Sequence, residues 1–284
     1  MNAVCRKKYF NSDRVIKITS FLIMAVFTLI MLVPVVFMVL YSFFPTADVN
    51  TVMEGANIFK SASLEGYRDV FRQTPFLKMA YNSLWLSVVQ TLLQLIMAFF
   101  TAYAITRWKY PKRDLIFKFI IATMIIPTVA VMIPNYIIIN KMGLVGNKWG
   151  VVLPFIASGY AIFLMRQFFK SMPESIVEAA MIDGCSEFQI LFKIYLPMML
   201  PAIAALTIIL FVGHWNDYQW PLMVLSKPES MTLPLALVRF ENEGIIEWMP
   251  TAAACVMTML LPLILFLITQ KAFVETFADS AVKG

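Results

Sequence analysis

Charged residues are scarce in this sequence. Only 14% of its 284 residues are Asp, Glu, Lys or Arg, whereas about 25% is usual in a soluble globular domain. Sixty per cent of the residues are hydrophobic, and uncharged runs of the roughly 20 residues needed to cross a bilayer recur along the chain. The chain is therefore predicted to be an all-α integral membrane protein in contact with lipid, not one or two soluble domains.

Cysteine and histidine are also rare. The three cysteines, Cys5, Cys185 and Cys255, are widely separated and odd in number, so they provide neither a disulfide framework nor a metal-ligand spacing. His214 is the single histidine, which argues against a zinc site or a Ser-His arrangement within this chain. No glycine opens the G-x4-G-K-[ST] loop that holds nucleotide phosphates. We therefore expect no catalytic residue, no metal and no cofactor bound by this chain, and an intramembrane enzyme is disfavoured.

Six apolar runs are the main feature that is present. All backbone polar groups at bilayer depth must be satisfied internally, so each run is interpreted as a membrane-spanning helix. Prolines such as Pro127 and Pro154 within these runs predict kinks. The runs cover residues 18–44, 79–106, 119–139, 149–165, 198–213 and 251–269.

Lysine and arginine predict the orientation of these helices. Residues 1–17, 107–114, 166–195 and the C-terminal tail together hold fourteen of them, against eight in residues 45–78, 140–148 and 226–250. The positive-inside bias therefore places both termini in the cytoplasm. A net charge of +6 is explained by this topology, and nucleic acid is not an expected partner. The first run is about twice as long as a signal-peptide core and lacks a cleavage site, so it is expected to be retained.

The segment 171–197 carries strong helix signals. Ser171 to Glu174 and Ser186 to Gln189 each have the spacing of a capping box, and Gly184 between them can adopt the positive φ that ends a helix. An apolar stripe follows at helical spacing, formed by Phe188, Leu191, Phe192 and Tyr195. The pattern predicts two short amphipathic helices joined by a tight turn, either packed on their own bundle or offered to a partner's groove.

A resemblance to a known family rests on this segment. Glu178-Ala179-Ala180, Gly184 and Ile194-x-Leu196-Pro197 reproduce the pattern E-A-A-x3-G-x9-I-x-L-P. The sequence resembles permease subunits of binding-protein-dependent ABC importers, in particular the carbohydrate-uptake branch with the maltose-type second permease. Further similar stretches are residues 81–84, 101–104 with Arg107, 126–127, 132–134, 215–222 and 281–284. Cys185 departs from the family, which usually has Ala after the glycine.

The resemblance implies a type I importer permease with six spans and a cytoplasmic coupling-helix hairpin. It further implies a second homologous permease, two ATPase subunits or domains that bind ATP and Mg, and an extracytoplasmic solute-binding protein. The family's ATPase contact carries over onto the hairpin and the residues that follow it. These residues are Glu178, Ala179, Ala180, Asp183, Gly184, Phe188, Ile194, Leu196 and Pro197.

The predicted organisation has three parts. Residues 1–77 hold the cytoplasmic N-terminus, the first span and an outer loop; residues 78–270 form the transmembrane domain; residues 271–284 are a cytoplasmic tail. The implied location is a prokaryotic inner membrane, and the implied substrate is a carbohydrate, in particular an oligosaccharide. Importers of glycerol-phosphate belong to the same branch and stay an alternative. A stand-alone secondary transporter is a third option, but the inverted repeats typical of that class are not evident.

Polar residues near the end of the fifth run are candidates for the solute pathway. Asn216 and Asp217 lie among Trp215 and Tyr218, and aromatic faces beside amide and carboxylate groups suit a sugar. An interfacial aromatic belt is the alternative interpretation. Asn135, just after Pro134, is a further candidate. The loop 226–250 is mixed in charge, and either contacts the binding protein or is a solvated connector.

Overall fold

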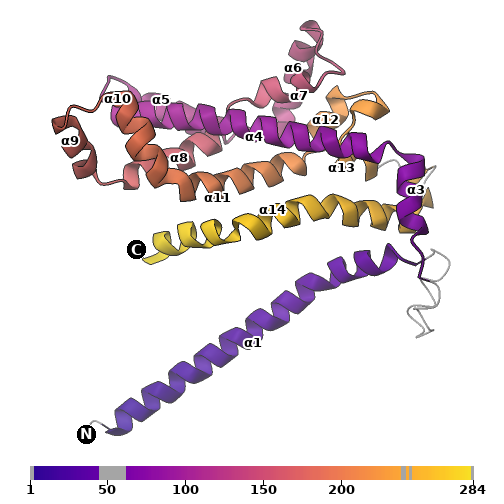
Figure 1. The fold of residues 1–284 in the computed structure, drawn as a ribbon, viewed down its shortest axis with the longest axis horizontal. Helices are drawn as coiled ribbons and strands as arrows, with labels where there is room; N and C mark the ends of the chain where they lie inside the picture. Colours follow the sequence, from indigo (N-terminus) through magenta and orange to yellow (C-terminus); the bar gives the residue numbers. More distant parts are fainter. Residues whose placement is uncertain (1–2, 45–61, 238–240, 243–244, 283–284) are drawn as a thin grey trace. The chain divides into compact units, whose positions relative to one another are not determined.

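The computed structural model describes residues 3–44, 62–237, 241–242 and 245–282. Most of these residues are helical, as predicted, and the strands among them form one short antiparallel pairing of β1 (Glu241–Asn242) with β2 (Ile245–Ile246). The contacts divide the chain into two compact units. One consists of residues 1–73 with 240–257, and the other of residues 74–239 with 258–284. Figure 1 gives the order of the elements along the chain.

The first unit is built on α1 (Ala3–Tyr41), α3 (Glu65–Gln73) and the start of α14 (Trp248–Val282). The Ser42 and Tyr67 hydroxyls are hydrogen-bonded at 2.8 Å. Gly66 lies so close to α14 that a Cβ there would meet Met249 Cγ at 2.8 Å. The described residues 62–73, between the first two predicted spans, are thus attached to both α1 and α14.

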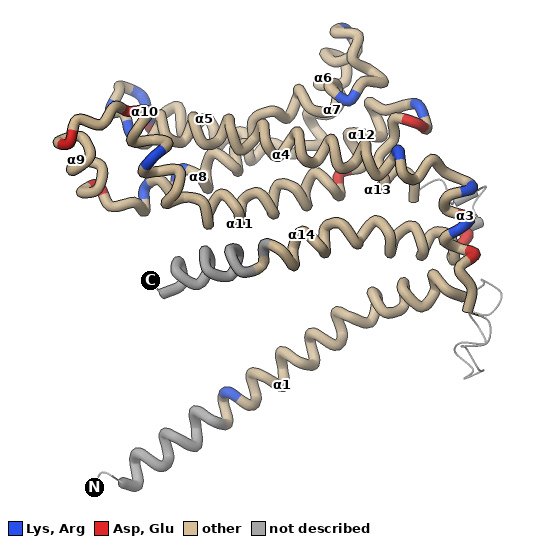
Figure 2. The backbone as a smooth tube through the Cα atoms, in the orientation of Figure 1, with Lys and Arg blue, Asp and Glu red and all other residues tan. Residues whose placement is uncertain are grey.

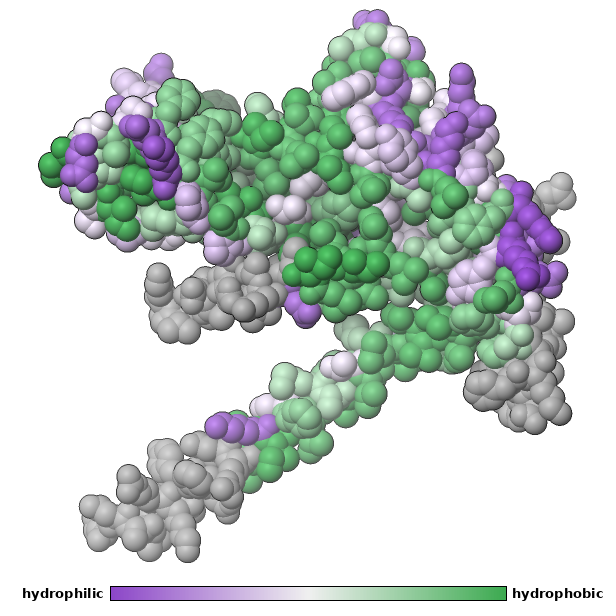
Figure 3. All heavy atoms as spheres, in the orientation of Figure 1, coloured by the Kyte–Doolittle hydropathy of each residue, from purple (hydrophilic) through white to green (hydrophobic). Residues whose placement is uncertain are grey.

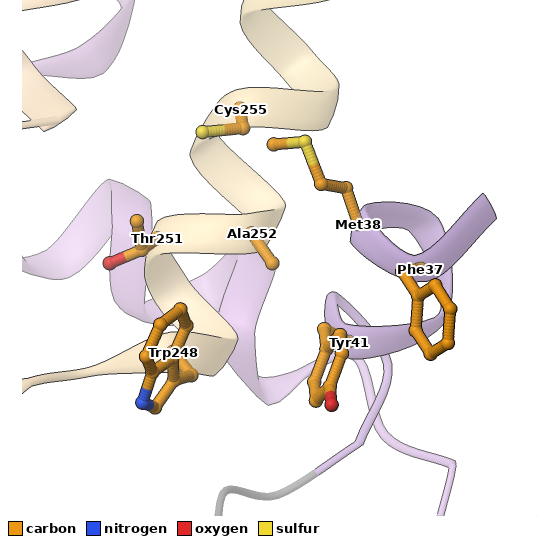
Figure 4. Close-up of a pocket in the computed structure, with 7 residues that line it drawn as sticks. All are labelled: Phe37, Met38, Tyr41, Trp248, Thr251, Ala252 and Cys255. Atoms are coloured by element: carbon orange, nitrogen blue, oxygen red, sulfur yellow. The ribbon is translucent and has the colours of Figure 1, made fainter. Parts of the chain in front are cut away.

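An apolar groove of about 480 Å³ lies between α1 and α14 within this unit. Figure 4 shows Met38 pointing toward Cys255, with the rings of Tyr41 and Trp248 nearby. The apolar side chains of Val15–Tyr41 are largely exposed. This is the pattern of a helix whose neighbours are lipid or other apolar helices, because a water-facing helix would carry polar residues on one side.

The core of the second unit forms where α4 (Phe76–Arg107), α8 (Gly159–Ser171) and α11 (Leu196–Trp215) pack together. Ala98 and Ala102 on α4 and Ala161 on α8 are fully buried. Small residues at a helix contact let the backbones approach closely, which drives packing where no water is available to be expelled. Figure 3 shows hydrophobic side chains over the middle of α4 and α11, with hydrophilic ones gathered beside α9 and α10.

Four helices in the described residues are long and apolar enough to cross a membrane singly: Val15–Tyr41, Phe76–Arg107, Glu187–Trp215 and Trp248–Ile268. Two bent pairs raise the number of spans to the predicted six, if each pair is one span. The first joins α5 (Arg113–Thr123) to α6 (Thr128–Lys141) at 95°. The second joins α7 (Lys148–Val152) and its 3-10 extension η3 (Leu153–Phe155) to α8 at 49°.

A kink was predicted in each of these two runs, and the structure has a bend in each that is sharp enough to separate two helices. Pro127 has no backbone N–H and restricts the residue before it, so the helix ends and α6 begins afresh after it. In the second pair, Ser158 caps α8 by accepting a hydrogen bond from Ala161 N–H. A Cβ at Gly159 would lie 2.9 Å from Thr123 Oγ1, so the break brings α8 close to α5.

The remaining elements lie at the two ends of α4. Figure 1 shows α9 (Glu174–Ile182) and α10 (Glu187–Gln189) at one end, and α12 (Gln219–Val224) and α13 (Leu233–Leu237) at the other. The 3-10 turn η5 (Pro228–Ser230) precedes α13. In loop 226–250, the predicted mixed-charge segment, Arg239 and Glu243 lie outside the described residues.

Candidate functional site

The turn after α9 has the conformation that the sequence predicts. Gly184 adopts φ +80°, its N–H donates to Met181 O, and Cys185 N–H donates to Ala180 O at 3.0 Å. These two bonds form a Schellman motif, which satisfies the last carbonyls of a helix. No atom lies within 4 Å of a Cβ built on Gly184. The backbone angle alone therefore requires glycine here.

The two predicted capping boxes have different outcomes. Ser186 accepts from Gln189 N–H, and Gln189 Oε1 accepts from Ser186 N–H at 2.8 Å, so this box is confirmed. The box at Ser171 was wrong. Ser171 ends α8, where its hydroxyl donates to Phe168 O at 2.8 Å, and Pro173 takes the N-cap position of α9 without a side-chain bond. The hydroxyl is thus already bonded within the preceding helix.

The second helix of the hairpin continues into the next span. α10 leads through a π-helical segment, η4 (Ile190–Tyr195), into α11, whereas the sequence predicted a separate short helix. Pro197 lies in the first turn of α11, and Leu196 N–H bonds to Leu191 O, five residues back. The wider π turn accommodates a proline that cannot donate to the usual carbonyl.

The predicted ATPase-contact residues divide into two groups. Glu178, Ala179, Asp183 and Gly184 are exposed on the hairpin, whereas Ala180 is buried with Val177 against the bundle. Phe188 is 73% exposed, and Ile194, Leu196 and Pro197 lie along the helix leading away from the turn. One face of the hairpin therefore packs on its own bundle and the other is exposed, while the contact with an ATPase stays a prediction.

The structure adds an apolar residue that the motif did not indicate. Ile182 is 86% exposed at the end of α9, beside Met181, which is also exposed. Large apolar side chains at an exposed turn mark a contact surface. The signal in the sequence was the position of Ile182 at the end of the predicted helix, immediately before the turn. A side chain at such an end has few neighbours that could bury it.

A polar clasp attaches the hairpin to α4. Glu187 at the start of α10 accepts from the Tyr103 hydroxyl and from Arg107, whose Nη2 lies 2.9 Å from Glu187 Oε1. Tyr103 and Arg107 are four residues apart, so they share one face of α4. Sequence reasoning missed the role of both residues. The available signal was the spacing of four between a tyrosine and an arginine at the end of an apolar run.

Aromatic rings pack against Tyr103 of the clasp. The Phe169 and Tyr195 centroids are 5.2 Å apart, and those of Tyr103 and Tyr195 are 5.7 Å apart, both in tilted or edge arrangements. Such pairs stabilise beyond their buried area. The hairpin end of α4, α8 and α11 is therefore one packed unit.

A second polar feature lies toward the other end of α4. A cavity of about 380 Å³ is lined mainly by polar and aromatic side chains. Its lining residues are Gln90, Gln94, Thr128, Met132, Phe155, Gly213, His214, Asn216, Asp217, Gln219 and Trp220.

Two buried glutamines of α4 hold one wall of this cavity. Gln94 donates to Phe155 O at 2.7 Å, and its Oε1 lies 3.1 Å from His214 Nε2. Gln90 donates to Val151 O, which also accepts from Trp220 Nε1 at 3.2 Å. Buried amides with these bonds are held in fixed orientations. Sequence reasoning missed both glutamines, although two polar residues four apart within an apolar run are a signal for a cavity or a partner.

The predicted pathway residues are only partly brought together. Asn216 and Asp217 line the cavity. Trp215 is buried and stacks on Phe211, with centroids 5.8 Å apart, while Tyr218 is exposed. Asn135 is half-buried on α6 and is not among the lining residues.

Asp217 is the one charged side chain among the described residues that line this cavity. Burial raises the pKa of its carboxyl, while backbone N–H groups of Trp220 and Gln219 act against that rise. No group of three or more His, Cys, Asp or Glu in the described part of the chain could hold a metal ion. The amides and rings of the lining can make hydrogen bonds and ring contacts.

A comparison with known families agrees with a helical bundle of membrane-spanning character. Residues 94–277 match the family described as binding-protein-dependent transport system inner membrane component. The chain belongs to this family.

Relatives of this permease extend over most or nearly all of its length. It is 31% identical over 271 residues, 95% of this chain and 96% of the relative, to the arabinooligosaccharides transport system permease protein AraQ of Bacillus subtilis (strain 168). It is 34% identical over 209 residues, 73% of this chain and 74% of the relative, to the sn-glycerol-3-phosphate transport system permease protein UgpE of Pectobacterium atrosepticum.

Solved structures agree with the fold. A chain of a bacterial ABC transporter involved in import of the acidic polysaccharide alginate superposes with a TM-score of 0.78 at 26% identity, over 92% of this permease and 98% of that chain. A chain of a bacterial alginate ABC transporter bound to its periplasmic protein gives 0.60 at 18% identity, over 86% and 92%. The permease has the type I ABC importer fold, as the resemblance implied.

Proposed function

We propose that this permease forms one half of the translocation pathway of an ATP-driven importer for a neutral oligosaccharide. The observation that supports it is the polar cavity beside α4. Its amides, Asn216, Gln219 and the buried Gln90 and Gln94, can exchange hydrogen bonds with sugar hydroxyls. The partly exposed ring of Phe155, which packs edge-on against the buried Trp220 with centroids 5.6 Å apart, offers an apolar face for sugar C–H groups.

The charge of the cavity favours a neutral solute. Its described lining contains Asp217 and neither Lys nor Arg. An anionic solute would place its charge near this half-buried carboxylate without a compensating cation, and like charges in a low dielectric repel strongly. The relative AraQ is named for the transport of arabinooligosaccharides, which are neutral sugars, and this agrees with the charge of the cavity.

Importers of glycerol-phosphate are the second candidate. The similarity to UgpE over 73% of this chain favours it. Such an importer would need cations from the second permease to bind the phosphate, because the described cavity of this chain offers none.

The proposed complex contains a second homologous permease, two ATPase subunits that bind ATP and Mg, and an extracytoplasmic solute-binding protein. The exposed face of the hairpin, with Glu178, Asp183 and Ile182, supports an ATPase contact. In this assembly the hairpin lies in the cytoplasm with both termini, and the segment 226–250 faces the binding protein outside. The family's description as an inner membrane component supports the membrane, and the positive-inside bias supports the orientation.

Uptake by the reconstituted complex tests the proposal. Uptake of a labelled neutral oligosaccharide, such as an arabinooligosaccharide, should resist an excess of glycerol-3-phosphate. Asp217→Ala should lower that uptake about tenfold, because removal of one buried polar partner costs about 1–3 kcal/mol. Asn140→Ala, at an exposed position of α6 outside the cavity, is the control. Preferential uptake of glycerol-3-phosphate, or normal uptake by Asp217→Ala, would contradict the proposal.

A further inference from the structure

A second polar cavity, of about 340 Å³, lies at the hairpin end of the bundle. It shares no lining residue with the cavity beside Gln94. Its walls come from the C-terminal end of α4, the start of α5, the end of α8, and α9. Figure 2 shows Lys and Arg grouped at this end of the second unit. Five basic residues line the cavity: Arg107, Lys109, Arg113, Arg166 and Lys170.

Arg166 is the most unusual of these residues. It is only 5% exposed, and its guanidinium lies 3.7 Å from the centroid of the Phe117 ring. One ion pair is present, from Nη2 to Asp114 at 3.3 Å, while Nε has no partner among the described residues. A buried N–H without an acceptor is costly. Arg166 therefore lines the cavity with a guanidinium that has a single ion-pair partner among the described residues.

The other charges at the cavity leave the α4–α5–α8 wall positive. Arg107 is paired with Glu187, and Arg113 lies 3.7 Å from Asp114. Lys109 and Lys170 form no ion pair in the described part of the chain. The acidic lining residues, Glu174 and Glu178, are both on α9. The charge is therefore separated, with cations on the bundle wall and carboxylates on the hairpin wall.

We propose that this cavity binds a phosphate group through Arg166, Lys109 and Lys170. Guanidinium and ammonium groups are the usual phosphate ligands, and a guanidinium presents several donors in a fixed plane. Basic pockets between membrane helices on the cytoplasmic side are suited to anionic lipid headgroups. A phosphate-bearing solute would offer the same oxygens, so the two sources differ in whether an acyl chain is attached.

Matched charge variants of the full-length permease in its complex test this site. Lys109→Gln with Lys170→Gln removes two cations from the cavity. Lys118→Gln with Lys193→Gln removes two exposed cations outside it, so both double variants have the same net charge. Binding of dioleoylphosphatidylglycerol is counted by native mass spectrometry after delipidation, with dioleoylphosphatidylcholine as the zwitterionic comparison. Inorganic phosphate is titrated separately by calorimetry.

The cavity variant should bind the anionic probe roughly twentyfold more weakly than the outside variant, since each basic residue contributes about a threefold to tenfold change. A loss confined to phosphatidylglycerol identifies a lipid headgroup. The same loss with inorganic phosphate identifies a soluble ligand. Equal affinity of the two double variants for both probes would overturn the proposal.

Discussion

Gly184 is a residue at which backbone conformation alone limits the choice of side chain. Its φ of +80° falls in the left-handed region, and the space around it is open. β-branched residues are strongly disfavoured there, whereas asparagine tolerates it. The angle sets the direction in which α10 leaves the turn, and so the position of α9 beside the bundle.

We expect Gly184→Val to lower solute uptake at least tenfold and to weaken retention of the ATPase, because the strained turn opens. Gly184→Asn should keep most of both, since its side chain has the same open space without the same strain. Transport by the reconstituted complex and ATPase co-purification are the measurements. Equal uptake by the two variants would show that the turn geometry does not matter for coupling.

Glu187 is a charged residue that connects the hairpin to α4. It accepts hydrogen bonds from both Tyr103 and Arg107, and its side chain is partly exposed. The ion pair lies between the surface and the interior. Its contribution should therefore exceed that of a fully solvated pair, which is commonly below about 1 kcal/mol.

Glu187→Gln should loosen the hairpin by about 1 kcal/mol, because the carboxylate charge that strengthens the bonds from Tyr103 and Arg107 is lost. Hydrogen exchange of residues 174–190 should accelerate about fivefold. Glu229→Gln removes the exposed partner of Lys78, 3.5 Å away, and should leave exchange there unchanged. The same acceleration in both variants would argue against the clasp.

At the scale of elements, the two serines of segment 171–197 show why one cap forms and the other does not. Ser186 follows a turn, so its hydroxyl is free to cap α10. Ser171 is still within α8 and bonds to that helix. A capping pattern is thus informative only where the preceding helix has already ended.

Replacing each serine by alanine distinguishes the two positions. Ser186→Ala should destabilise the start of α10 by about 1 kcal/mol. Ser171→Ala should change little, because it removes only a bond to a carbonyl within α8. Local hydrogen exchange at residues 187–195 is the measurement. A larger effect at Ser171 would contradict the observed caps.

The fold and the hairpin turn could be predicted because their signals are local. Long uncharged runs predict spans, and Gly184 with Ser186 predicts the turn and the cap. The prolines of the two bent runs predicted kinks but not the separation of each run into two helices, since a proline in an apolar run is compatible with either a kink or a break. The clasp and the glutamine wall were missed because Glu187 meets Tyr103, and Gln94 meets His214, only after the helices pack.

At the scale of the whole molecule, the positive-inside bias makes a topological prediction. Reporter fusions at Lys109 and Ser186 should indicate the cytoplasm, as should one at the C-terminus. Fusions at Glu65 and Glu229 should indicate the outside. Alkaline phosphatase and a fluorescent protein are complementary reporters for these sites. A cytoplasmic signal at Glu229 would remove the sixth span and contradict the six-span arrangement.

α4 carries the clasp at its C-terminal end and the glutamine wall in its middle. Gln94 and Arg107 are about 20 Å apart along the helix. A packed α-helix resists compression along its axis, so it behaves as a rigid rod over this distance. A displacement of the hairpin that pulls on Glu187 would therefore shift Gln94 by a comparable amount relative to Phe155 and His214. In the proposed complex, one helix would in this way link a movement of the hairpin to the affinity of the cavity for its solute.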